Sequence, residues 1–172
     1  MKRFLPILLL LLPLSLGAQR HAVVNLSVNY MRSQPDYESA LETQNLMGTP
    51  VEIIAEDGYW RQIVSPEPYT AWVTDMGLVE MTPEQLKDYI AAEKYIFTDL
   101  YGHVYEKASK SAGYICDLVE GDLLLVTMAD GKPLRRHGFL GVSLPSGKTG
   151  WVSGRCLRNF REWAESRRPT FG

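Results

Sequence analysis

YTAWVTDMGL, at residues 69–78, is nearly repeated 79 positions later as KTGWVSGRCL, at residues 148–157. In both stretches a threonine and a small residue precede Trp-Val and a hydroxyl residue, and a leucine closes the stretch. Self-similarity of this kind indicates a duplicated structural unit. We expect its role to be packing rather than chemistry.

The sequence that precedes each Trp-Val stretch repeats in the same order. Each half has a glycine followed by a short apolar strand, GTPVEII and then GDLLLVT, and an Asp-Gly turn follows (residues 57–58 and 130–131). Gly48 and Trp72 are 24 residues apart, whereas Gly121 and Trp151 are 30 apart, which indicates about six extra residues in the middle hairpin of the second copy. Short strands separated by polar turns predict two small antiparallel barrels.

The alternation of apolar residues predicts which side chains fill each barrel. We expect Trp72 and Trp151 to close the barrels, with Thr74 and Ser153 in the turns that follow. The remaining inward positions are Val51, Ile53 and Ile63 in the first barrel, and Leu123, Leu125, Phe139 and Val142 in the second.

Two helices are expected outside the barrels. Thr82, Pro83 and Gln85 form a capping box with proline in the first turn, which predicts a linker helix within residues 81–96, from Pro83 to about Lys94. Its apolar face would carry Leu86, Tyr89 and Ile90. A second, C-terminal helix is expected in residues 159–172, with an apolar stripe of Phe160, Trp163 and Ala164 that should pack on a neighbour.

The first 18 residues have the pattern of a secretory signal peptide. Lys2 and Arg3 precede an apolar run that ends at Gly17-Ala18, and this run is too short for a stable membrane span. We expect cleavage after Ala18, with Gly17 as the alternative, and hence a secreted protein of the periplasm or cell surface. Removing Lys2 and Arg3 takes the net charge from −2 to −4, which argues against nucleic acid as a partner.

Little in the sequence suggests catalysis. Neither the histidines nor the cysteines have the spacing of metal ligands, so we expect no metal and no cofactor. Cys116 and His137 make a poor nucleophile and base, because no cation or helix start near Cys116 would lower its pKa. Cys116 and Cys156 are either a disulfide, which an oxidising compartment permits, or two small buried residues. The acid pairs Glu56/Asp57 and Glu120/Asp122 are interpreted as solvated turn residues.

The first half is richer in surface aromatic residues. A tyrosine-rich and tryptophan-rich loop surface with scattered acids is typical of a groove for a peptide or a sugar. The alternative is that Trp60 and Tyr30 belong partly to the core and that the others decorate turns. The residues concerned are Tyr30, Tyr37, Tyr59, Trp60 and Tyr69.

Three stretches, MRSQPDYESALETQNLMGTPVEII, YTAWV and TPEQLKDYIAAEKYIFTDLYGHVYEKAS, resemble the non-catalytic N-terminal part of secreted NlpC-type cysteine peptidases. These enzymes, also called dipeptidyl-peptidase VI or gamma-D-glutamyl-L-diamino acid endopeptidases, cut peptidoglycan stem peptides. The resemblance covers residues 23 to 169, and it implies two SH3-like barrels joined by a helix. The family's catalytic domain and its Asp-Cys-Ser-Gly-type motif should follow the last helix, and neither Cys116 nor Cys156 stands in such a motif.

The resemblance therefore implies a mainly β chain: signal peptide 1–18, SH3-like barrel 19–80, linker helix 81–96, SH3-like barrel 97–158, and C-terminal helix and tail 159–172. It also implies that the first barrel helps to hold the free amine of the stem peptide's L-alanine, with Tyr69 as the tyrosine and Glu42 as the acid. Glu38 lies close enough in sequence to be an alternative to Glu42.

The expected function is recognition of peptidoglycan stem peptides, or scaffolding for a peptidase domain packed on the first barrel. Two alternatives remain open. The chain could be the N-terminal fragment of an active NlpC-type endopeptidase, or a module that docks envelope proteins through its loop aromatics. No catalytic residue is expected in the chain itself.

Overall fold

The computed structural model describes residues 20–67 and 69–167. The expected signal peptide, residues 1–18, lies outside the described residues. In the part of the chain that the structure describes, no helix is long and apolar enough to cross a membrane.

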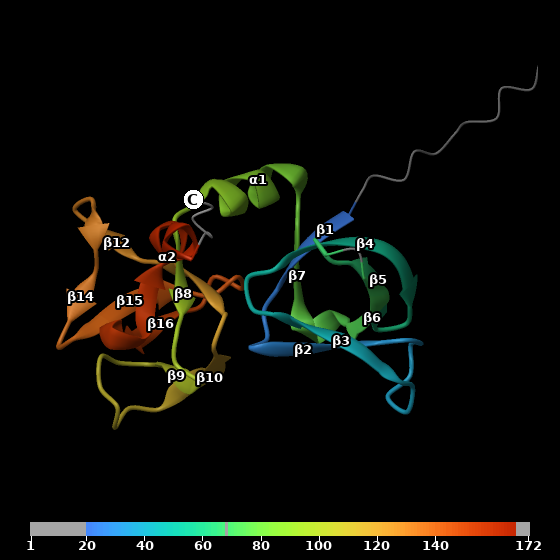
Figure 1. Cartoon of the computed structure of the whole chain (residues 1–172), viewed down its shortest axis with the longest axis horizontal. Coiled ribbons are helices and arrows are strands. Elements are labelled where there is room, and N and C mark those ends of the chain that lie inside the picture. Colours follow the sequence, from blue (N-terminus) through green and yellow to red (C-terminus); the bar gives the residue numbers. More distant parts are fainter. Residues whose placement is uncertain (1–19, 68, 168–172) are drawn as a thin grey trace, which may run out of the picture.

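The first barrel is a seven-stranded sheet in the order β3-β2-β6-β5-β4-β1-β7 (Figure 1). All of its strand pairs are antiparallel. Its strands are β1 Arg20–Val24, β2 Val28–Arg32, β3 Leu41–Leu46, β4 Pro50–Asp57, β5 Trp60–Val64, β6 Thr70–Thr74 and β7 Leu78–Met81, with a 3-10 turn, η1 Asp75–Gly77, before β7.

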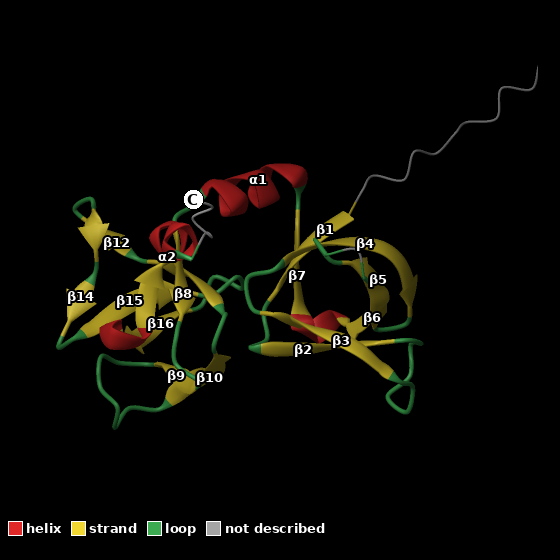
Figure 2. Ribbon diagram, in the orientation of Figure 1, coloured by secondary structure: helices red, strands yellow, loops and turns green. Residues whose placement is uncertain are grey.

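The second barrel repeats this order in an eight-stranded sheet, β10-β9-β16-β15-β11-β8-β17, with β14 paired to β15. The six-residue insertion is in the middle hairpin, as expected, and forms a small separate ribbon of β12 and β13 (Figure 2). The strands are β8 Lys94–Phe97, β9 Tyr101–Tyr105, β10 Tyr114–Val119, β11 Leu123–Val126, β12 Met128–Ala129, β13 Lys132–Pro133, β14 Arg135–Arg136, β15 Phe139–Ser143, β16 Thr149–Ser153 and β17 Leu157–Asn159, with η2 Gly154–Cys156 before β17. The expectation of a mainly β chain with two SH3-like barrels, a linker helix and a C-terminal helix is confirmed.

The repeated Trp-Val stretches are β6-η1-β7 and β16-η2-β17. The expectation that the tryptophans close the barrels is wrong. Side chains alternate along a strand, and in both copies it is the neighbours of the tryptophan that point inward. Ala71 and Val73 are buried in the first barrel, and Val152 is buried in the second, whereas Trp72 and Trp151 are only partly covered.

Of the other inward positions, Val51, Ile53 and Ile63 in the first barrel and Val142 in the second are confirmed, because all four belong to the buried core clusters. Phe139 is buried but lies on the opposite face of β15 from Leu140 and Val142, with its ring against Tyr105, so the expectation is wrong for it. The expectation that Leu123 and Leu125 point into the barrel is also wrong. Leu124 is the fully buried residue of β11, and its two neighbours are half-buried. Leu123 points instead to the junction with the first barrel, where its backbone N–H donates to the carbonyl of Met47 over 2.9 Å.

The linker helix is shorter than expected. α1 spans Pro83–Ala91 and begins with the predicted capping box between Thr82 and Gln85. It ends at Ala91, and Lys94 turns back and donates through Nζ to the carbonyls of Tyr89, Ile90 and Ala92. Residues 94–97 form β8, where Ile96 and Phe97 are buried in the second barrel, so the expected boundary at 97 differs from the structure.

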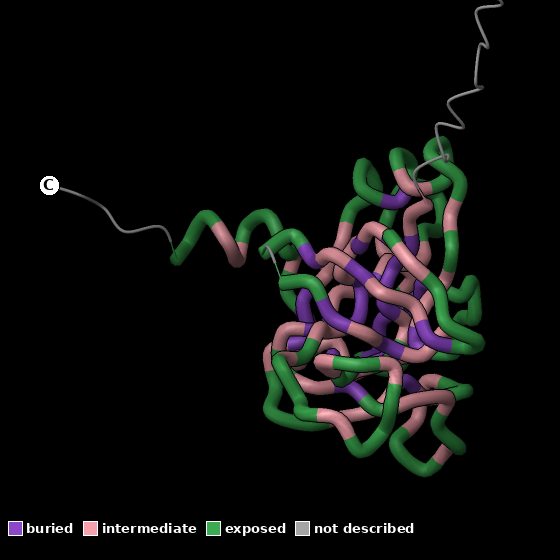
Figure 3. The backbone as a smooth tube through the Cα atoms, turned by 90° about the vertical axis from the view of Figure 1, so that its right-hand side faces the viewer, coloured by how far each residue is buried: buried purple, intermediate pink, exposed green. Residues whose placement is uncertain are grey.

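Tyr89 is the only residue of α1 that is fully buried, and Ile90, expected on the same face, is exposed. α2, Phe160–Ser166, is capped by Asn159 and contacts β8 and β17. It has no buried residue, and Figure 3 shows it projecting from the barrels with only half-buried and exposed positions.

The two barrels meet through the same turn of each repeat. Gly48 and Gly121 both have positive φ angles, of 89° and 102°. A Cβ built on Gly48 would lie 2.7 Å from the Cβ and the carbonyl oxygen of Leu123, and one built on Gly121 would lie 2.6 Å from Leu46. At Gly48 the neighbouring atoms include the backbone oxygen of Leu123, so only glycine allows this approach of one backbone to the other, whereas at Gly121 the neighbour is the end of the Leu46 side chain.

The side chain of Asp122 stabilises this contact between the barrels through hydrogen bonds. Its carboxylate is fully buried and accepts hydrogen bonds from the backbone N–H of Val119 in its own barrel, over 2.8 Å, and of Met47 in the other barrel, over 3.0 Å. The side chain of Met47 is 1% exposed and belongs to the core of the second barrel. The first barrel thus contributes a residue to the core of the second.

The expectation that Glu120 and Asp122 are solvated turn acids is therefore wrong for Asp122. Burial raises the pKa of Asp122 to about 7, in spite of the two hydrogen bonds, which favour the ionised form. In the sequence Asp122 follows a glycine and has the pattern of an exposed turn residue. It is buried because of the contact with the first barrel.

We expect replacement of Gly48 by alanine to loosen the junction. Gly58→Ala is the matched control, because Gly58 also has a positive φ but has nothing within 4 Å of a built Cβ. Backbone strain alone should lower the free energy of unfolding by about 1 kcal/mol in Gly58→Ala. Overpacking against Leu123 should bring the loss to about 2–4 kcal/mol in Gly48→Ala, measured by denaturant unfolding. Equal losses in the two variants would contradict the tight junction.

We also expect Asp122 to make the stability of the folded chain depend on pH. The folded pKa of about 7 lies above the unfolded value near 4, so the folded state retains the proton to higher pH. This contribution is fully present below about pH 4 and is lost as the pH rises through about 7, by up to about 4 kcal/mol. Unfolding curves of the wild type and of Asp122→Asn between pH 4 and 8 should diverge by this amount. The same pH profile for both proteins would rule the effect out.

Candidate functional site

A cleft of about 300 Å³ lies at the junction of the barrels. One wall is the end of β3 and the following turn, and the opposite wall is the β5–β6 turn. Gly121 and Leu123 of the second barrel complete it. The lining residues from the first barrel are Thr43, Gln44, Asn45, Leu46, Met47, Thr49, Ser65, Pro66, Glu67 and Tyr69.

The β5–β6 turn holds Tyr69 at the rim of this cleft. Ser65 donates through its backbone N–H to the carbonyl of Tyr69 and through Oγ to the carbonyl of Glu67. The Ser65 side chain is buried, so these bonds are sheltered from water and fix the turn. Tyr69 is 52% exposed, which leaves its ring and hydroxyl free to meet a ligand.

Glu42 lies near the cleft but does not line it. The pairing of β2 with β3 shifts register between Met31 and Arg32, and Glu42 is the extra residue of the resulting bulge. Its side chain is exposed, and no hydrogen bond joins it to Tyr69 within residues 20–67 and 69–167. The carboxylate that the cleft does contain belongs to Glu67.

The electrostatic character of the cleft is acidic and polar. Its described lining includes Glu67 and several hydroxyl and amide side chains but no lysine or arginine. The side-chain nitrogen of Asn45 is buried without a hydrogen-bond partner in the described structure. The Glu67 carboxylate, with no lysine or arginine beside it in the described lining, favours a ligand with positive charge. The Asn45 side-chain nitrogen is a hydrogen-bond donor, so it favours a ligand that also brings an acceptor such as a carbonyl oxygen.

The aromatic residues of the first barrel do not form one groove. Tyr37, Tyr59 and Trp60 form a separate cluster, in which the ring centroids of Tyr37 and Trp60 are 4.9 Å apart and those of Tyr59 and Trp60 are 5.6 Å apart. Trp60 is buried, as the alternative interpretation proposed for it, whereas Tyr30 is 55% exposed. Of the five aromatic residues, only Tyr69 lines the cleft.

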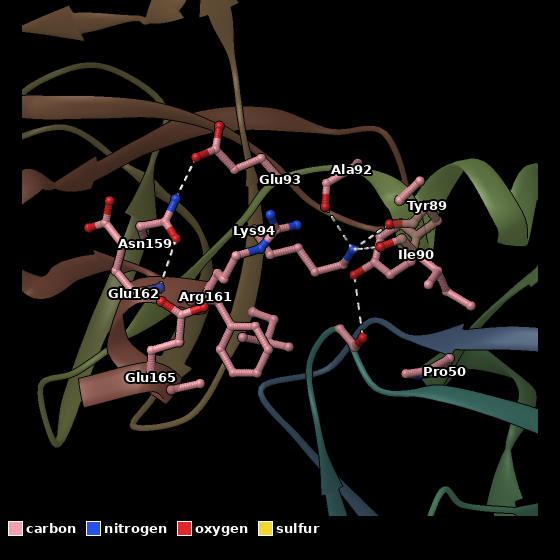
Figure 4. Close-up of a pocket in the computed structure, with 15 residues that line it drawn as sticks. Pro50, Tyr89, Ile90, Ala92, Glu93, Lys94, Asn159, Arg161, Glu162 and Glu165 are labelled. Carbon is pink, nitrogen blue, oxygen red and sulfur yellow. Dashed lines mark hydrogen bonds between the residues drawn. The ribbon is translucent and has the colours of Figure 1, made fainter. Parts of the chain in front are cut away.

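A second and larger groove, of about 730 Å³, lies between the end of α1 and α2. Figure 4 shows Lys94 extending from its start at β8 toward the carbonyls of α1, while Arg161, Glu162 and Glu165 lie on the α2 side. Glu93 and Asn159 are hydrogen-bonded across its edge. Lys94 is fully engaged, since it caps α1 and lies 4.5 Å from the centre of the Tyr89 ring, and burial lowers its pKa.

The cysteines are two free thiols, and the disulfide alternative is therefore wrong. Burial, aided by the carboxylates of Asp122 and Asp117, raises the pKa of Cys116 to about 11. At neutral pH Cys116 is a thiol, which is a poor nucleophile. Among the described residues no group of three or more His, Cys, Asp and Glu side chains is placed to hold a metal ion.

Of the two site residues predicted from the sequence, Tyr69 lines the cleft and Glu42 does not, and the other lining residues were not predicted. The prolines that flank Glu67 announce a turn just before Tyr69, and this signal could have identified Ser65 and Glu67. The contribution of Gly121 and Leu123 could not be foreseen, because it depends on how the two repeats pack.

Comparison with known proteins supports an SH3-like fold, with one family match in the first barrel and fold matches to solved structures. Residues 31–78 match the family described as the bacterial dipeptidyl-peptidase SH3 domain. No curated protein matches the sequence.

Two solved structures share the fold. An NlpC/P60 family protein from Bacillus cereus aligns with a TM-score of 0.63 and 16% identity, over 80% of this chain and 55% of that one. An NlpC/P60 endopeptidase from Photobacterium damselae subsp. piscicida aligns with a TM-score of 0.54 and 15% identity, over 82% of this chain and 33% of that one. The chain thus spans about half the length of the first structure and a third of the second. At these identities the likeness establishes the fold alone.

We expect Cys116 to be slow to react in the folded chain. A pKa about two units above that of a free thiol leaves about 100-fold less thiolate at neutral pH. Iodoacetamide at pH 7.5 should therefore alkylate Cys116 at least about 100-fold more slowly in the native chain than in guanidinium, as measured by peptide mass spectrometry. Comparable rates in the two states would show that folding neither shields Cys116 nor raises its pKa.

Proposed function

We propose that this chain is a secreted, non-catalytic module that recognises peptidoglycan stem peptides in the cleft between its barrels. The observation that carries the proposal is the acidic and polar cleft with Tyr69 at its rim, located in the barrel whose residues 31–78 match the dipeptidyl-peptidase SH3 family. The free α-amine of a stem peptide carries a positive charge, which this lining can accept.

In this proposal Tyr69 and Glu42 hold the amine of the ligand's first residue. The phenol oxygen of Tyr69 accepts one hydrogen bond from the ammonium group, and a carboxylate accepts another. Glu42 is exposed on the β3 bulge just outside the cleft, so it would act at the entrance, whereas Glu67 lies within the lining. The two carboxylates therefore make separable contributions.

The cleft also suggests why both barrels are needed. Its inner end is formed by Gly121 and Leu123, which are held against the first barrel by the Asp122 hydrogen bonds. A peptide that extends beyond its amine would contact this second barrel. The proposed recognition thus depends on the junction as well as on Tyr69.

A second candidate is that the chain is the front part of a cysteine peptidase. The observation in its favour is that both structures of similar fold are considerably longer than this chain. In that case a peptidase domain packed on the first barrel would provide a further wall to the cleft, and the same residues would act as substrate-binding residues.

Binding of L-Ala-γ-D-Glu-diamino acid tripeptide tests the proposal. We expect saturable NMR shifts of amides around the cleft, and no such shifts with the N-acetylated tripeptide, which lacks the charged amine. Tyr69→Phe and Glu42→Gln should each weaken binding about tenfold, since each removes a hydrogen bond to a charged group.

Two variants serve as controls. Tyr59→Phe alters an exposed tyrosine outside the cleft lining and should bind as the wild type does. Glu67→Gln tests the other carboxylate: a loss confined to Glu67→Gln would replace Glu42 with Glu67 in the proposal. Absence of shifts with millimolar tripeptide would reject recognition by this chain alone.

A further inference from the structure

The outward face of the β9–β10 ribbon carries a cluster of aromatic side chains in the second barrel. Tyr101, His103 and Tyr105 alternate along β9, so they point to the same side. Tyr114 is opposite Tyr105 and Asp117 is opposite His103 in the register of the two strands. We call these five residues the tyrosine face.

The rings of the tyrosine face surround His103. Its centroid lies 5.1 Å from that of Tyr101, 5.7 Å from that of Tyr105 and 4.5 Å from that of Tyr114. Tyr101 and Tyr114 are 57% and 62% exposed. Two large rings are therefore open to solvent on either side of a half-buried floor, which is unusual for a surface that only packs.

Asp117 gives this face its charge. The hydroxyl of Tyr101 donates to Oδ1 of Asp117 over 2.9 Å, and Nε2 of His103 lies 3.6 Å from the same oxygen. No lysine or arginine forms an ion pair with Asp117 in the described structure, and its side chain is 49% exposed. The pKa of Tyr101 is raised, first by its hydrogen bond to Asp117, since the negative carboxylate disfavours ionisation of the phenol.

The equivalent face of the first barrel shows that the fold does not require this cluster. Met31 and Val104 are the matching core residues of β2 and β9, and both ribbons carry a bulge at the same place. When the two ribbons are aligned on these core residues, the five residues of the tyrosine face, taken in chain order, correspond to Val28, Tyr30, Arg32, Leu41 and Gln44 of the first barrel. The two ribbons share their strand pairing and their alternation of inward and outward side chains. The rings of Tyr101, Tyr105 and Tyr114 and the carboxylate of Asp117 have no counterpart in the first barrel.

We infer that the tyrosine face binds an alkylammonium group, with the cation over the exposed rings of Tyr101 and Tyr114 and beside the Asp117 carboxylate. The inference rests on charge complementarity. Tyrosine rings present a negative face to a cation, and the half-exposed Asp117 carboxylate, which has no lysine or arginine partner in the described structure, adds negative charge to the same place. This site is distinct from the cleft, which lies at the junction with the first barrel, and it does not depend on the proposed function.

Titration with choline chloride tests the inference, with amide NMR shifts as the readout. We expect saturable shifts confined to β9 and β10, and none with sodium chloride at the same ionic strength. The neutral isostere 3,3-dimethyl-1-butanol separates charge from shape. Shifts of equal size with the isostere would overturn the inference and indicate simple apolar contact.

Three variants complete the test. Asp117→Asn and Tyr114→Leu should each weaken choline binding by about fivefold, and both side chains are exposed enough for the barrel to tolerate the change. Tyr30→Leu, at the position equivalent to His103 in the first barrel, should leave binding unchanged. Wild-type affinity in the Asp117 and Tyr114 variants, or an equal loss in Tyr30→Leu, would overturn the proposed site.

Discussion

The contact between the two glycine turns is the constraint on which the rest of this structure depends. Asp122 cannot be withdrawn from water without hydrogen bonds, and it obtains one of its two from the backbone of Met47 in the other barrel. Gly48 allows its backbone to come close enough to that of Leu123 for this contact. The cleft with Tyr69 exists because this contact sets Gly121 and Leu123 against the first barrel.

Much of the fold could be predicted because it depends on short-range patterns. The repeat of Trp-Val, the capping box at Thr82 and the glycine before each apolar strand are local signals, and each has its expected counterpart in the structure. The errors arise where two faces of a strand are both partly covered. Trp72 and Leu123 are large and apolar, so their composition did not reveal that they face away from the barrel interior.

The candidate site was less accessible to sequence reasoning. Tyr69 was named through the resemblance to NlpC-type peptidases, by its place just before Ala-Trp-Val, whereas the cleft around it is assembled from two repeats that are distant in the chain. Asp122 shows the same limit. A turn acid in the sequence gives no sign of complete burial, because the residue that buries it is contributed by the other repeat. The duplicated framework is thus easier to predict than the surfaces on which the copies differ.

Met47 has a consequence for how this chain folds and unfolds. Its side chain completes the core of the second barrel although it belongs to the chain segment of the first. A second barrel produced alone would therefore contain a void where a large buried side chain is missing, and its melting would not report the behaviour of the whole. We therefore expect the two barrels, although separate units of architecture, to unfold as one cooperative unit, so that destabilising either one destabilises both.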